Sequence, residues 1–198
     1  TGDLVNIGMP AFEPNNYWVD WEAYAPAVWF SHPGDPLVKV SHPSGWGYPA
    51  ATLEIHLPEG VTGANGSDRS ILVVDGTKVY NMWQFNRTSS TTATAKAFAQ
   101  ADVLAGTGWG LVRADGQPVG AGITAAGHSM LAGLLIQAET DGGEIRHALQ
   151  LSVDNRLNHP GFVGEAIHSD GEAETGIVQQ GQRLAIPPDV PMPAGLSP

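Results

Sequence analysis

The chain has 198 residues, of which 42% are hydrophobic and only 15% are charged, and its formal net charge is -11. Nine Lys and Arg residues are spread over the whole length, so no clustered basic surface exists for a phosphate backbone or an anionic membrane. Nucleic acid and membrane surfaces are therefore excluded as expected partners.

Cysteine is absent, which removes disulfides, thiolate metal sites and a cysteine nucleophile together. No apolar run approaches the roughly 20 residues that a membrane-spanning helix needs. The chain opens at Thr1 without Met, as a processed secreted or periplasmic protein would, although a trimmed chain looks the same. Gly and Pro number 25 and 15 and stand singly between apolar stretches, which is typical of the turns of an all-β protein.

Residues 1–34 are rich in aromatic residues and carry four prolines, which predicts an irregular segment without a long helix or a central strand. Residues 37–40 and 52–57 then alternate as strands do, and the second run places Leu53, Ile55 and Leu57 on one face. Residues 71–74 and 79–85 flank Asp75-Gly76, which predicts a β-hairpin with these two residues at its tip.

The strand expected over residues 79–87 mixes aromatic area with amide groups. Tyr80, Gln84 and Asn86 would share one face, and Trp83 would lie on the other. Flat ring surfaces beside amide groups suit a sugar ring, whereas Trp83 taken alone is more typical of a core residue in a β-sandwich. A further short strand is expected at residues 93–98.

The apolar residues of the stretch 130–138 have helical spacing, which predicts a short helix there. Asp141-Gly142-Gly143 would end that helix. Residues 144–153 read as an interior strand, because alternate positions from Ile145 to Val153 are aliphatic apart from His147. A last strand is expected at residues 182–186, followed by an extended tail at residues 187–198.

His147 has two interpretations. A buried imidazole needs hydrogen-bond partners, so it is either a satisfied core residue or an acid or base at the floor of a cleft. The acidic residues near expected elements include Glu139, but the pairing of carboxylates for glycoside hydrolysis depends on their separation in space. A lyase would instead use a His or Tyr base, here His147 or Tyr80, with Arg146, Arg156 or Asn155 neutralising a uronate carboxyl.

The seven histidines lack short-range metal-ligand spacing, so no metal or other cofactor is expected. The acidic stretch 168–174 leaves calcium open, although it lacks the ligand order of an EF-hand.

Several motifs resemble a group of bacterial secreted proteins that has no established reaction. They are Tyr80-Asn81-Met82-Trp83-Gln84, residues 134–139, residues 143–149, Asp154-Asn155-Arg156 and Ala166-Ile167-His168. The resemblance covers about the last 130 residues and implies a jelly-roll fold and an extracellular role with polysaccharide. It also implies a further helix and strand after the tail, so truncation or processing at Pro198 is expected.

The sequence thus predicts one all-β domain over residues 1–198, a β-sandwich or jelly roll with one short helix, and a closed barrel as the alternative. The expected function is extracellular binding and cleavage of a polysaccharide, by hydrolysis or by a lyase reaction. The predicted catalytic residues are His147, Glu139 and Tyr80. The predicted substrate-binding residues are Trp83, Gln84, Asn86, Arg146, Asn155 and His168. A non-catalytic carbohydrate-binding or structural module is the rival, and an oxidative metalloenzyme would need the histidines to converge.

Overall fold

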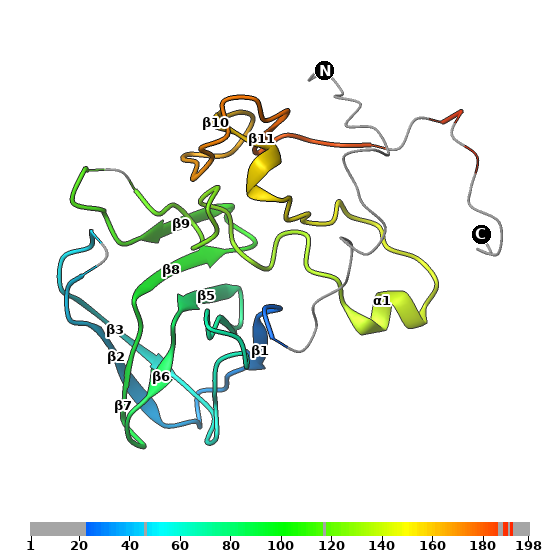
Figure 1. Cartoon of the computed structure of the whole chain (residues 1–198). Helices are drawn as coiled ribbons and strands as arrows, with labels where there is room; N and C mark the ends of the chain where they lie inside the picture. The colour runs from blue at the N-terminus through cyan, green and yellow to red at the C-terminus, as the bar shows by residue number, and fades with distance from the viewer. Residues whose placement is uncertain (1–22, 46, 117, 186–187, 190, 192–198) are drawn as a thin grey trace.

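The computed structural model describes residues 23–45, 47–116, 118–185, 188–189 and 191 (Figure 1). Its regular elements are mostly β-strands, and one short α-helix, α1 (Gln137–Asp141), is found in this part of the chain. The all-β prediction is confirmed. Residues 1–22 and most of the tail 187–198 lie outside the described residues.

The larger sheet has five strands in the order β1-β4-β5-β8-β9. Its strands are β1 (Ala27–Phe30), β4 (Ile71–Asp75), β5 (Lys78–Trp83), β8 (Ala97–Asp102) and β9 (Thr107–Gly110). The strand β1 runs parallel to β4, and the other neighbours are antiparallel. The prediction of an irregular segment was wrong for residues 27–30, but β1 follows Pro26 and occupies an edge position, where a nearby proline is tolerated.

The predicted hairpin between β4 and β5 is confirmed, with a shift of one residue at its tip. Asp75 pairs with Lys78, so Gly76 and Thr77 form the two-residue loop. Gly76 has a φ of +59°, and a positive φ at the first of two loop positions is the pattern of a type II′ hairpin turn. Glycine is therefore required at the first loop position rather than the second.

The smaller sheet has four strands in the order β3-β2-β7-β6. They are β2 (Leu37–His42), β3 (Ala51–His56), β6 (Asn86–Arg87) and β7 (Thr92–Thr94). The predicted alternation is confirmed, because Leu53, Ile55 and Leu57 are 9%, 3% and 0% exposed. The strand expected at residues 93–98 is divided between β7 and β8, which belong to different sheets.

The chain changes sheets at Gln84, which has a φ of +50°. The strand β5 therefore ends at Trp83, and Asn86 belongs to the other sheet. The predicted shared face of Tyr80, Gln84 and Asn86 was wrong, because strand parity holds only while the backbone stays extended.

One hydrophobic core cluster combines side chains of both sheets, among them Val40 and Ile55 of the smaller sheet and Met82 and Phe98 of the larger. A second cluster lies around Leu72, Val79 and Ala101 of the larger sheet. Three of the strand pairings are parallel, whereas a jelly roll is antiparallel. The jelly-roll resemblance therefore stays a prediction.

The predicted helix over residues 130–138 was wrong in its position. Residues 130–134 form turns, and Met130, Leu131 and Leu134 pack against the second core cluster. Gly133 has a φ of +83°, and a Cβ at this position would overlap the backbone of Gln150. This left-handed residue interrupts the helix that the spacing indicated, and α1 begins only at Gln137.

Residues 144–153 form no strand, and most of them are exposed. The interior strand predicted there was wrong, and so was the strand at residues 182–185, while Ile186 lies outside the described residues. A 3₁₀ helix (Asn155–Leu157) leads instead into β10 (Asn158–Phe162), which pairs in parallel with β11 (Val178–Gln180). No helix in the described ranges is both long and apolar enough to span a bilayer.

Candidate functional site

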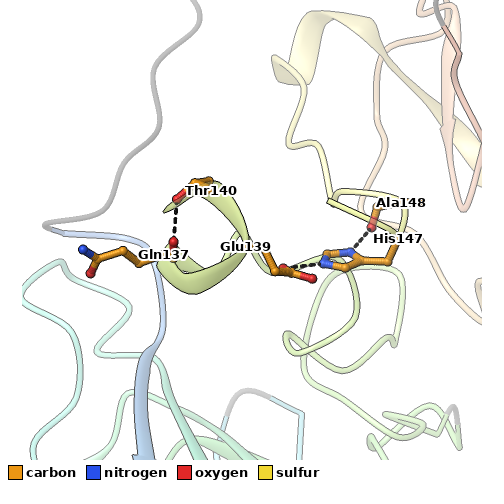
Figure 2. A network of polar contacts seen from close by, with 5 residues as sticks. All are labelled: Gln137, Glu139, Thr140, His147 and Ala148. Atoms are coloured by element: carbon orange, nitrogen blue, oxygen red, sulfur yellow. Dashed lines mark hydrogen bonds and ion pairs between the residues drawn. The ribbon is translucent and has the colours of Figure 1, made fainter. Parts of the chain in front are cut away.

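The helix α1 places Glu139 opposite residues that follow it closely in the chain. Gly142 and Gly143 end the helix, with Gly143 at a φ of +75°, and the Glu144 N–H donates to the Glu139 carbonyl oxygen over 3.2 Å. This reversal turns the chain back on α1, so that His147 faces the Glu139 side chain (Figure 2).

His147 and Glu139 form a hydrogen-bonded ion pair. The His147 Nε2 lies 2.9 Å from the Glu139 Oε2, and the His147 Nδ1 lies 2.9 Å from the Ala148 carbonyl oxygen (Figure 2). A carbonyl and an ionised carboxylate only accept hydrogen bonds, so both contacts are hydrogen bonds when both ring nitrogens carry protons. The Ala148 carbonyl first, and then the Glu139 carboxylate, raise the pKa of His147 above 6.5.

The pair is accessible to a ligand, since 36% of the His147 side chain and 30% of the Glu139 side chain are exposed. The predicted burial of His147 was wrong. Because residues 144–153 do not form a strand, strand parity does not govern the direction of its side chain. The Glu139 Oε1 has no described hydrogen bond. The arrangement thus favours the imidazolium form of His147 beside a carboxylate, and one oxygen of that carboxylate makes none of the described hydrogen bonds.

Tyr80 lies in the core cluster of the two sheets and is 6% exposed. Burial, and then the charge of Asp75, raise the pKa of its hydroxyl above 10.0, which disfavours the phenolate that a base would need. The described hydrogen bonds do not join Tyr80 to the Glu139–His147 pair. Its predicted catalytic role therefore has no contact that supports it.

The predicted sugar-binding residues of the segment after Tyr80 separate in space. Trp83 ends β5 and packs partly buried against the core cluster. The Gln84 N–H donates to the Asp68 carbonyl oxygen over 2.7 Å, and Asn86 is exposed on β6. The predicted proximity of Trp83 or Gln84 to His147 stays a prediction, because no described contact joins them.

Arg146, Asn155 and His168 occupy three different environments. The Arg146 guanidinium lies 2.7 Å from the Glu144 carboxylate and is 80% exposed, and Asn155 begins the exposed 3₁₀ helix. The His168 imidazole is half-buried, its Nε2 has no described hydrogen-bond partner, and burial lowers its pKa below 6.5. Of these three residues, only Arg146 neighbours the Glu139–His147 pair in sequence.

The sequence interpretation did not assign a role to Asn81, which is fully buried. Its side-chain oxygen accepts from the Ser129 hydroxyl over 3.0 Å and from the Met130 N–H over 2.9 Å, and its amide nitrogen lies 3.4 Å from the Ala121 carbonyl oxygen. The signal in the sequence was the amide side chain of Asn81 between apolar residues in the middle of a strand, which indicates a buried hydrogen-bonding group. Asn81 holds residues 121–134 against the sheet.

Within the described ranges, no three or more His, Asp or Glu side chains gather in a way that could hold a metal ion. Comparisons with protein-family models, with curated proteins and with solved structures found no significant match to this chain.

Proposed function

We propose that this protein is an extracellular carbohydrate-active domain that binds a polysaccharide and cleaves it at the Glu139–His147 pair. The observation that carries the proposal is the doubly hydrogen-bonded His147 beside an accessible carboxylate. A His or a carboxylate within hydrogen-bond reach of a substrate proton is the usual equipment for general acid–base catalysis.

His147 is the proton donor in this proposal. Its Nε2–H leaves the Glu139 carboxylate and passes the proton to the glycosidic oxygen as the bond from that oxygen to the sugar carbon breaks. Glu139 stabilises the imidazolium before transfer, as a carboxylate does for a catalytic histidine. In hydrolysis a second carboxylate assists the attacking water.

The charge balance favours hydrolysis of a neutral polymer over a lyase reaction on a uronate polymer. A lyase needs a cation to neutralise the uronate carboxyl, and Arg146 already contacts the Glu144 carboxylate. The net charge of -11 also repels a polyanion. The preference for carbohydrate rests on the aromatic and amide side chains of a chain with few charges.

The test is turnover by His147→Gln and Glu139→Gln on a panel of neutral and uronate polysaccharides. We expect each variant to lose roughly 10²–10⁴-fold in rate, because each removes one member of the acid–base pair. New reducing ends report hydrolysis, and the absorbance of unsaturated uronates reports a lyase. His56→Gln is the matched control, since the His56 imidazole also contacts a backbone carbonyl, that of Asp35, over 2.7 Å.

A second candidate function, a non-catalytic binding module, is favoured by the fact that both nitrogens of His147 are already occupied. In that case the pair would simply fasten residues 144–148 to α1. A His147→Gln protein that melts early but keeps its activity per folded molecule would contradict the catalytic role. Measurable binding without any product on the whole panel would favour the module.

A further inference from the structure

The two-stranded sheet of β10 and β11 (Figure 1) carries an exposed phenylalanine, and one amide side chain from each strand contacts the same carboxylate. Phe162 ends β10 and is 49% exposed. We propose that Phe162, Gln180 and Asp170 form a subsite that binds a neutral sugar ring, separate from the Glu139–His147 pair.

The strand register places Phe162 next to a residue whose amide contacts the carboxylate. Phe162 is the register partner of Gln180, and the Gln180 Nε2 donates to the Asp170 Oδ1 over 2.9 Å. The Asn158 Nδ2 donates to the same oxygen over 3.2 Å, and Asn158 is 5% exposed. A buried amide and a strand amide thus fix the Asp170 carboxylate.

The backbone around the ring is also held in place. The Val163 N–H donates to the Gln180 carbonyl oxygen over 2.9 Å. Gly181 follows with a φ of +83°, and a Cβ there would overlap the Val163 carbonyl oxygen. The close approach of the two segments therefore requires glycine, and it keeps Phe162 next to Gln180.

The chemistry of these groups matches a sugar ring. Both amides donate to the Oδ1 of Asp170, and its Oδ2 has no described contact, so it can accept hydrogen bonds from sugar hydroxyls. The exposed Phe162 ring offers a flat apolar surface to the C–H face of a pyranose, while oriented polar groups engage the hydroxyl rim. A carboxylate acceptor makes the stronger, charge-assisted kind of hydrogen bond.

The local charge selects a neutral ring over an acidic one. Residues 157–183 contain Glu165, Asp170, Glu172 and Glu174 and one cation, Arg183, whose guanidinium lies 3.2 Å from the Glu165 carboxylate. A uronate would therefore meet an excess of like charge, and the cation of this segment already contacts a carboxylate. The choice of carbohydrate rests on the proposed function, whereas the subsite does not require the Glu139–His147 pair to be catalytic.

The experiment measures binding of oligosaccharides of glucose, mannose, galactose and xylose by calorimetry, with matched uronate oligosaccharides. We expect at least one neutral ligand to bind, and Phe162→Ala to weaken it at least about tenfold, as truncation of a central aromatic contact does. Phe30→Ala is the matched control, because Phe30 is 65% exposed on β1, and it should bind as the wild type does.

Asp170→Asn is the second variant, and it keeps the size of the side chain but removes its charge. We expect this variant to bind the neutral ligand more weakly and to keep an unchanged circular dichroism spectrum. Equal affinity for Phe162→Ala and Phe30→Ala, binding of uronates alone, or no binding of any neutral ligand would overturn the subsite. If the proposed reaction is right, a His147→Gln background keeps the ligand intact during the titrations. Binding that is lost in Phe162→Ala but kept in Phe30→Ala, together with cleavage by His147→Gln at the wild-type rate, would remove the proposed reaction and retain the subsite.

Discussion

At the scale of single residues, the protonation state of His147 decides what the candidate site can do. Two acceptors face its two ring nitrogens, which favours the protonated ring as a proton donor over the neutral ring as a base. A donor with a raised pKa stays charged further into the neutral range than an ordinary histidine. The site is thus suited to protonating a leaving group.

We predict that His147 titrates above 6.5 and that Glu139→Gln lowers its pKa, because the amide supplies no negative charge to stabilise the imidazolium. NMR titration of the imidazole measures both values. Since the folded-state pKa is raised, the stability from this pair is fully present below pH 6.5 and is lost as the pH rises through the folded value. An unchanged His147 pKa in Glu139→Gln would contradict the ion pair.

At the scale of elements, the larger sheet fixes residues 121–134 through the side chain of one strand residue. The Asn81 oxygen accepts two hydrogen bonds from Ser129 and Met130, and the apolar side chains of the same segment cover Leu72 and Val79. Residues 121–134 lead into α1, the helix that carries Glu139.

We predict that Asn81→Ala destabilises the protein by about 1–3 kcal/mol, because the part-buried donors of Ser129 and Met130 lose their acceptor. Urea unfolding gives the free energy, and hydrogen exchange should show faster exchange in residues 121–134. Asn86→Ala is the control, since Asn86 is exposed on β6. The anchoring role would be wrong if the two variants had equal stability and equal exchange.

Some of these elements were predictable from the sequence pattern alone, and others were not. Residues 71–85 combine aliphatic runs with a turn glycine, and both signals act over a few residues, so the hairpin was predictable. The apolar spacing of residues 130–138 is genuine, but it is satisfied by turns packed on the sheet, because Gly133 takes a left-handed conformation. The alternation of residues 144–153 likewise indicated a strand, yet a strand forms only where a neighbour supplies hydrogen bonds.

At the scale of the whole molecule, the two larger sheets share one core. Phe98 of β8 is 1% exposed within the cluster that combines them, and its ring meets Trp109 edge to face with centroids 6.3 Å apart. A side chain in this position contributes to the packing of both sheets rather than of one hairpin.

We predict that Phe98→Ala lowers the free energy of unfolding by about 3–5 kcal/mol, the usual cost of a cavity left by a core phenylalanine. Urea unfolding followed by circular dichroism and by tryptophan fluorescence measures this loss, and Phe30→Ala should change stability by about 0.5 kcal/mol or less. Separate transitions for the two probes, with only one affected by Phe98→Ala, would contradict a shared core.

The sequence by itself determined the all-β class, the hairpin and the strands β2 and β3, because turn chemistry and side-chain alternation act within a few residues. It also contained Glu139 and His147 as candidates, without a means to pair them. Only the tertiary structure brought Glu139 and His147 together, placed Tyr80 in the core and joined Phe162 to Asp170 through Gln180. These contacts depend on chain reversals at Gly142-Gly143 and Gly181 and on parallel pairing of distant strands, which local periodicity does not encode.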